Sequence, residues 1–327
     1  MATELPGVHL AVRHPQVSSA QMLADLVPPR EFAKATFDTY IPDPLFPSQA
    51  DAVEICKTTT KRKGLFGKGV AAAGVYLDGG FGVGKTHLLV SIYRDFNGKK
   101  LFGSFLAFTS LIGALGFAPA LALLSKYQLI CIDEFELDDP GNTMIMSRLL
   151  NDLSAKGVLF AATSNTPPNA LGEGRFAAAD FQREIQGIGD RFTFVRVDGE
   201  DFRHRDPDQR HQASNFQELQ TFIGDGSAAS NDDFKELLAH LSQLHPSKYS
   251  HLLDGIERVA IIDAFELKDE FDALRFVAFV DRAYELQIKI RSSGTALTAI
   301  FPKRFIDGGY RKKYLRAISR LGAMSSS

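Results

Sequence analysis

Gly79-Gly80-Phe81-Gly82-Val83-Gly84-Lys85-Thr86 follows a strand-like apolar run at 74–78 and precedes a run at 86–94 that can form a helix. The eight residues match G-x-x-x-x-G-K-T, the pattern of a phosphate-binding loop. Glycines free the backbone N–H groups of such a loop to wrap a β-phosphate at a helix N-terminus. We therefore expect all eight residues to bind ATP, with Lys85 on the β- and γ-phosphates and the Thr86 hydroxyl on Mg²⁺. The strand before and the helix after disfavour a chance glycine-rich turn.

A second apolar run, 129–132, is typical of a buried strand and ends in two carboxylates, Asp133 and Glu134. In P-loop ATPases an acidic residue at such a strand end helps to hold Mg²⁺. We expect Asp133 to hold Mg²⁺ through water and Glu134 to orient the water that attacks ATP. Acidic turn residues after a strand are common in isolation, but that alternative fits poorly beside an intact phosphate loop.

Composition sets the broad class of the protein. The chain has 327 residues, room for two domains, and its 45% apolar and 23% charged residues are ordinary for a soluble globular protein. The formal charge of −2 disfavours a general nucleic-acid binder. Cys56 and Cys131 have no metal-ligand spacing, and Cys131 lies in a predicted core strand. A buried thiol and an N-terminus unlike a signal peptide favour a cytoplasmic location.

The stretch 101–125 carries no charge and is long enough to resemble a membrane span. It lies between the phosphate loop and Asp133, however, and those two must meet at one Mg²⁺. Glycines and a proline also interrupt it. We expect a buried strand at 104–109, a short helix and a turn, and no membrane span.

The central part of the chain alternates strand-like and helix-like segments. Strands are expected near 74–78, 104–109, 128–133, 158–163 and 192–197. This alternation predicts an α/β fold, a P-loop ATPase core with a parallel sheet and right-handed crossovers. Asn165 follows the fourth strand and is our candidate for a hydrogen bond to the γ-phosphate or the water. A turn asparagine before Thr166-Pro167-Pro168 is an equal alternative.

The domain organisation follows from shifts in composition. We expect an N-terminal segment at 1–65, the ATPase core at 66–200, a linker or insert at 201–232 and a C-terminal lid-like region at 233–327. In the last region, strand-like runs at 258–265 and 287–291 flank an amphipathic helix and form a β-α-β unit. Two arrangements stay open: the unit extends the main sheet, or it forms a separate lid.

Several segments together resemble one family, the ZapE cell-division ATPases and the related mitochondrial AFG-like ATPases. The phosphate loop alone is unspecific, but its combination with D-E-F-E, the C-terminal R-F…D…Y pattern and a terminal S-R-L is far more specific. The resemblance covers about 32–324, although 103–108 is apolar where the family often has a His-Phe-His run. The matching segments are 79–86, 131–139, 163–168, 181–183, 198–203, 274–284 and 316–321.

The resemblance implies an AAA+ fold, ATP and Mg²⁺ as cofactors, a nucleotide-dependent homo-oligomer and an arginine finger from a neighbouring subunit. Arg183 is the first candidate for the finger and Arg191 the second; a surface arginine is the competing interpretation for either. Arg320, in the terminal S-R-L, is the candidate for a lid arginine that reports ATP. It is also one of seven basic residues between Lys303 and Arg320 that can form a solvated face.

The sequence thus predicts an ATP hydrolase that remodels or regulates a protein partner. The resemblance names a division protein such as FtsZ as one candidate partner. A nucleic-acid-linked ATPase of the helicase-loader type is the main alternative, because basic clusters at 57–68 and 303–320 can contact phosphates. A nucleotide-gated scaffold without hydrolysis is a third possibility, and the intact Asp133 and Glu134 argue against it.

Overall fold

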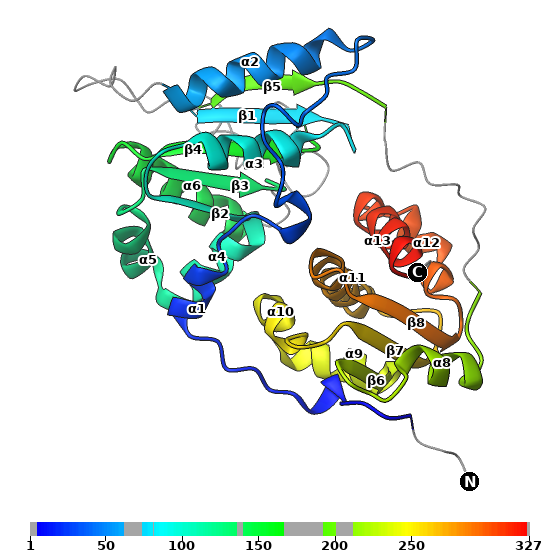
Figure 1. Ribbon diagram of the computed structural model, residues 1–327. Helices are drawn as coiled ribbons and strands as arrows, with labels where there is room; N and C mark the ends of the chain where they lie inside the picture. Colours follow the sequence, from blue (N-terminus) through cyan, green and yellow to red (C-terminus); the bar gives the residue numbers. More distant parts are fainter. Residues whose placement is uncertain are drawn as a thin grey trace. The chain divides into compact units, whose positions relative to one another are not determined.

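The computed structural model describes residues 5–61, 74–80, 82–135, 140–166, 192–200 and 212–325. The chain forms two compact units, Ser18–His204 and the combination of Met1–Val17 with Arg205–Ser327 (Figure 1). Residues 5–17 therefore belong with the C-terminal half of the chain, whereas the predicted boundaries placed 1–65 together ahead of the ATPase core.

The first unit is built on a five-stranded parallel sheet, which confirms the predicted α/β core. The strand that leads into the phosphate loop, β1, lies between β4 and β5. Across the sheet the strands run in the order β2 (Lys100–Ser104), β3 (Leu129–Asp133), β4 (Leu159–Ser164), β1 (Gly74–Gly79) and β5 (Phe192–Val197). Buried residues run almost without interruption along the first four of these strands, as expected for a parallel sheet with both faces covered.

Helices cover both faces of this sheet. Val75 and Leu77 of β1 pack with α2 (Pro47–Lys61) and α3 (Lys85–Asp95). Tyr76 points to the opposite face, because side chains alternate along a strand. There it packs with three helices and lies in the same apolar cluster as Leu26, which follows α1 (Ser19–Ala24). The three helices are α4 (Phe105–Leu115), α5 (Phe117–Leu124) and α6 (Pro140–Ser154).

The predicted strand at 104–109 is wrong, since β2 ends at Ser104 and α4 begins at Phe105. Ser104 caps the helix by accepting the Ala107 N–H at 3.2 Å. A short apolar run does not distinguish a buried strand from a buried helix, which explains the error. Gly116, with φ 82°, separates α4 from α5. Within the described residues, no helix combines the length and apolarity that crossing a membrane requires.

The second unit has its own parallel sheet, β6 (Ala229–Asp233), β7 (Arg258–Ala264) and β8 (Lys289–Gly294) in that order. The β-α-β unit is thus part of a separate sheet and does not extend the main one. A large apolar cluster joins α9, α11 and α13 to β7 and β8, and a small one joins Leu5 and α8 to β6 and β7. The helices are α8 (Phe216–Ile223), α9 (Phe234–Gln243), α10 (Tyr249–Leu252), α11 (Glu270–Glu285), α12 (Lys303–Ile306) and α13 (Arg311–Ser325). Short 3₁₀ turns lie at 10–12, 30–32, 246–248 and 297–299.

The described part of the predicted linker, 212–232, contains α8 and most of β6. The sequence of β6, Ala-Ser-Asn-Asp-Asp, is as polar as a loop, yet four of its five residues are buried. The N-terminal segment makes this possible: Val8 pairs with Ser230, Asn231 Nδ2 donates to the Leu5 carbonyl at 2.9 Å, and the Ala11 N–H donates to Asp232 Oδ1 at 2.9 Å. Buried polar groups need such partners. These partners lie more than 200 residues away in the sequence, so the local pattern gave no sign of the strand.

Candidate nucleotide-binding site

At two glycines of the phosphate loop, Gly79 and Gly84, a side chain would clash with a neighbouring segment. Gly84, the N-cap of α3, has φ 86°, and a Cβ there would lie 2.5 Å from Cε2 of Tyr40. A Cβ on Gly79 would lie 2.1 Å from the carbonyl oxygen of Val197. Tyr40 and Val197 thus lie in close contact with the loop at two different positions and restrict its conformation. Phe81 lies outside the described residues.

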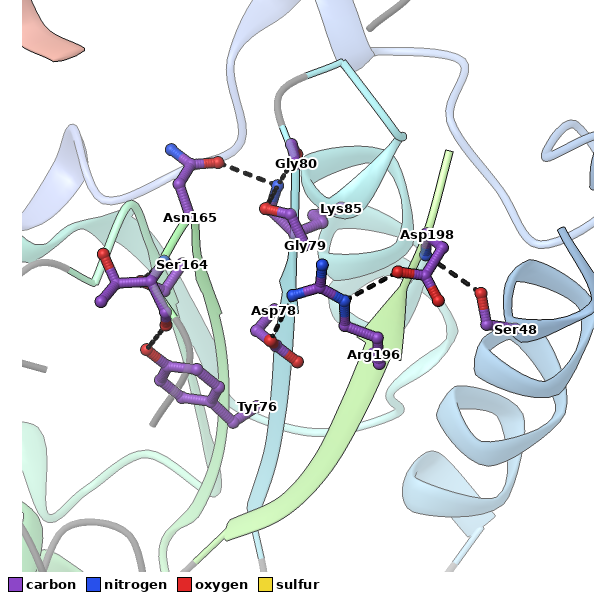
Figure 2. Close-up of polar contacts among 11 residues, drawn as sticks. Ser48, Tyr76, Asp78, Gly79, Gly80, Lys85, Ser164, Asn165, Arg196 and Asp198 are labelled. Carbon is purple, nitrogen blue, oxygen red and sulfur yellow. Dashed lines mark hydrogen bonds and ion pairs between the residues drawn. The ribbon is translucent and has the colours of Figure 1, made fainter. Parts of the chain in front are cut away.

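Lys85 joins the loop to the end of β4. Its side chain is buried, and Nζ donates to the carbonyl oxygens of Gly79 (3.0 Å) and Gly80 and to Asn165 Oδ1 (2.9 Å) (Figure 2). All three partners are neutral oxygens, so these contacts do not neutralise the ammonium charge. Asn165 is thus in direct contact with the lysine of the phosphate loop.

Thr86 and Asp133 meet at the start of α3 and the end of β3. Thr86 Oγ1 donates to Asp133, at 3.2 Å from Oδ1 and 3.3 Å from Oδ2. A hydroxyl and a carboxylate are hard oxygen ligands, and Mg²⁺ in nucleotide sites uses one or two of them together with phosphates and water. The donor set therefore fits Mg²⁺, and the two predicted metal residues lie side by side.

Among the described residues, the groups that contact Asp133 are hydroxyls, a backbone N–H and the neighbouring Glu134, with no basic side chain. Burial and the neighbouring Glu134 raise the pKa of Asp133 to about 6, against hydrogen bonds from Thr163 and Thr86 that lower this pKa. Two adjacent carboxylates in a poorly solvated position repel each other. A divalent cation would relieve that repulsion, which is what a metal site needs.

Glu134 has a backbone conformation that is rare for its residue type. Its φ is 50°, in the left-handed region. Thr163 holds the segment in this shape: Thr163 Oγ1 accepts the Glu134 N–H at 3.1 Å and donates to Asp133 Oδ1 at 2.5 Å, and its carbonyl accepts the Phe135 N–H at 2.7 Å. Strain of this kind concentrates at functional sites.

Sequence reasoning did not assign Thr163 a role in the site. A signal was available, because β3 and β4 pair in parallel with Ile132 opposite Ala162, which brings the next residues, Asp133 and Thr163, side by side. Using that signal requires the register of two strands, which is not visible in either strand alone.

An ion-pair chain beside the loop was also missed. Asp78, the residue before the loop, is buried and pairs with Arg196 Nη1 of β5 at 3.0 Å. Arg196 Nε contacts Asp198 Oδ1 at 2.8 Å, and the Asp198 N–H donates to Ser48 Oγ of α2 at 3.0 Å (Figure 2). The hydrogen bond from Arg196 lowers the pKa of Asp198. The chain fixes the end of β5 next to the start of the phosphate loop.

Of the three predicted arginines, the structure describes Arg320. Arg183 and Arg191 lie outside the described residues. Arg320 belongs to the second unit, where it and Arg316 (2.7 Å) both contact the carboxylate of Asp281. The Arg320 side chain is 12% exposed and also lies over the Tyr284 ring, so it is not part of a solvated face.

Comparisons with known proteins extend these observations. The profile of the AFG1-like ATPase family matches residues 16–222 and 224–327. The cell division protein ZapE of Escherichia coli K12 is 30% identical over 150 residues, which cover 42% of this chain and 40% of ZapE. Lactation elevated protein 1 homolog B of Danio rerio is 29% identical over 161 residues, 41% of this chain and 31% of that protein. The chain thus spans less than half the length of these curated relatives.

Solved structures with a similar fold come from proteins of low sequence identity. DnaI gives a TM-score of 0.44 at 19% identity and covers 53% of this chain and 93% of its own. AMPPCP-bound DnaA from Aquifex aeolicus gives a TM-score of 0.42 at 16% identity, and the match covers 55% of this chain and 53% of the DnaA chain.

Proposed function

The chain belongs to the AFG1-like ATPase family, and on this premise we propose that it is a Mg²⁺-dependent AAA+ ATPase that hydrolyses ATP. The observation that carries the proposal is the convergence of Lys85, Thr86, Asp133 and Asn165 from α3, β3 and the end of β4. Cation, hydroxyl, carboxylate and amide are the groups that phosphoryl transfer to water uses.

Each residue has a role that its contacts allow. Lys85 would exchange its carbonyl partners for the β- and γ-phosphates, where its charge is more strongly attracted. Thr86 and Asp133 would hold Mg²⁺, which neutralises charge on the phosphate oxygens when it is bound. Glu134 would orient the attacking water, and Asn165 would hydrogen-bond the γ-phosphate or that water.

A complete site would also need an arginine from a second subunit. We propose Arg183 for this finger, with Arg191 as the next candidate, and Arg320 as the lid arginine of a nucleotide-dependent homo-oligomer. A mixture of Arg183→Ala and Glu134→Gln would then regain activity, since one of its interfaces pairs an intact Glu134 with an intact Arg183. A finger in trans would be excluded if the specific activity of the wild type did not depend on protein concentration and the mixture of the two variants recovered no activity.

The energy of hydrolysis would serve to remodel or regulate a protein partner in the cytoplasm. The name of the E. coli relative, cell division protein ZapE, supports a division protein such as FtsZ as the first candidate. A pull-down with Glu134→Gln in the presence of ATP tests this, because a variant that binds but does not hydrolyse ATP should retain the partner.

Phosphate release from Mg-ATP tests the enzymatic proposal. The wild type should release phosphate, and chelation of Mg²⁺ should stop the release. Lys85→Ala should bind no ATP, because the site loses the ammonium that faces the phosphates. Equal phosphate release by the wild type and Lys85→Ala would contradict the proposed site.

A further inference from the structure

Tyr40 reaches the phosphate loop from the segment that precedes α2. Its side chain is buried, and its hydroxyl donates to the carbonyl oxygen of Val83 at 3.0 Å. We propose that Tyr40 is a positioning residue that fixes the orientation of the Val83–Gly84 peptide for phosphate binding. The ligand in this inference rests on the proposed ATPase function, but the effect on the loop does not.

The planarity of the peptide bond transmits the effect of the hydroxyl. In a trans peptide the C=O of one residue and the N–H of the next point in opposite directions within one plane. A hydrogen bond that holds the Val83 carbonyl therefore also holds the direction of the Gly84 N–H. Backbone N–H groups of this loop are the donors that wrap a β-phosphate. Tyr40 thus prepares one such donor before nucleotide arrives.

The ring of Tyr40 restrains the same peptide from a second direction. It lies so close to Gly84 that a Cβ there would be 2.5 Å from Cε2. The ring also forms a T-shaped pair with the ring of His87, from the first turn of α3, with centroids 5.4 Å apart. His87 Nε2 in turn lies 2.9 Å from the Thr36 carbonyl oxygen and 3.1 Å from Thr39 Oγ1. The ring is therefore held between the loop and the first helical turn.

The hydroxyl also remains a donor at physiological pH. Burial raises the pKa of Tyr40 to about 12. A neutral phenol keeps its proton and can donate to a carbonyl, which a phenolate cannot.

Tyr249 provides a matched control. It is fully buried in the second unit, and its hydroxyl donates to the Leu241 carbonyl at 2.9 Å. Burial also raises the pKa of Tyr249 to about 12. Tyr249→Phe therefore removes the same kind of buried hydrogen bond, in a unit that does not contain the phosphate loop.

The experiment compares Tyr40→Phe, Tyr249→Phe and the wild type in two measurements, with thermal stability as a check that the two substitutions destabilise the fold equally. The first is hydrogen exchange of the peptide that covers 82–86, without nucleotide. The second is equilibrium binding of fluorescent ATP and ADP, together with kcat and KM. Both phenylalanine variants should lose a similar amount of thermal stability.

Tyr40→Phe should speed exchange in the loop, and Tyr249→Phe should leave it unchanged. Tyr40→Phe should also lower the affinity for ATP and for ADP alike, by roughly fivefold to tenfold, because both nucleotides carry a β-phosphate and one buried hydrogen bond is lost. The effect should appear in KM more than in kcat.

The inference would be overturned if the loop of Tyr40→Phe exchanged hydrogen at the wild-type rate. It would also be overturned if nucleotide affinity fell equally in Tyr40→Phe and Tyr249→Phe. A wild type that binds neither nucleotide would contradict the proposed function instead. The exchange measurement would still decide the role of Tyr40 in that case, since it needs no ligand.

Discussion

Two carboxylates, Asp133 at the end of β3 and Asp281 on α11, show how differently the two units treat a largely buried negative charge. Asp133 receives hydrogen bonds from the hydroxyls of Thr86 and Thr163 and has Glu134 as its neighbour. Asp281 is 14% exposed and contacts the guanidinium groups of Arg316 and Arg320 on α13. The proposed Mg²⁺ would balance the first carboxylate, whereas two arginines of the protein contact the second.

The difference separates a proposed metal-binding site from a structural joint, the contact of Asp281 with Arg316 and Arg320. A carboxylate that keeps its charge uncompensated lowers the stability of the empty protein and raises its affinity for a metal. A carboxylate between two arginines links α11 to α13, and removing one member of a buried ion pair is destabilising. The two sites should therefore respond to the same substitution, Asp to Asn, in opposite ways.

The largest effect is expected at the structural joint. Asp281→Asn should lower the free energy of unfolding by about 3 kcal/mol, because two partly buried guanidinium groups lose the carboxylate that they both contact. Chemical denaturation measures this change. Asp272→Asn on the same helix is the control: Asp272 pairs with Arg275 at 3.1 Å, both are 36% exposed, and an exposed pair contributes less than about 1 kcal/mol. Equal losses in the two variants would remove the distinction between the sites.

At the other carboxylate the same substitution should stabilise the protein when no metal or nucleotide is present. The pKa of Asp133 is raised to about 6 from 3.8, so the folded state favours the protonated form. Its contribution to stability is present below the unfolded pKa and is lost as pH rises through about 6. At pH 8 the free energy of unfolding of Asp133→Asn should therefore be higher than that of the wild type, by no more than about 3 kcal/mol.

Denaturation of both proteins in EDTA at pH 5 and pH 8 checks this prediction. The advantage of Asp133→Asn should shrink at pH 5, where the wild-type carboxyl is largely protonated. An advantage that is the same at both pH values would mean that the charge of Asp133 is not what lowers stability.

A smaller effect is expected on metal affinity. Asp133→Asn should weaken the apparent affinity for Mg²⁺ during ATP turnover by about 10- to 100-fold, the usual cost of losing a group that holds a metal through water. Phosphate release at a series of Mg²⁺ concentrations measures the change. Asp281→Asn, assayed below its unfolding temperature, should keep the wild-type Mg²⁺ dependence, and a shift as large as that of Asp133→Asn would contradict the comparison.

The sequence predicted the first of these sites better than the second. The phosphate loop, β1 and β3 carry strong local patterns, and the run ending in Asp133 and Glu134 needs only its own apolar residues to be recognised as a strand. The structure brings Thr86 to Asp133 and Lys85 to Asn165 because parallel strands end at one edge of the sheet. These contacts follow from the fold class once it is known.

What was missed depends on contacts that no local pattern encodes. Thr163 requires the register between two strands, and Tyr40 requires the path of a segment far from the loop in sequence. The strand β6 is polar and becomes buried only because residues 5–11 supply hydrogen bonds to it. The first residues of the helix at 105–115 were predicted as part of a strand at 104–109, because a continuous apolar run has no periodicity that distinguishes strand from helix.

The most direct test of the account separates binding from hydrolysis at Glu134. Binding of ATP and phosphate release should be measured on the same preparations of the wild type and Glu134→Gln. The account predicts that Glu134→Gln binds Mg-ATP about as tightly as the wild type and releases almost no phosphate, because the amide cannot orient and polarise the water as a carboxylate does. Hydrolysis by Glu134→Gln at the wild-type rate would contradict the assignment of this strand end as the catalytic edge of the site.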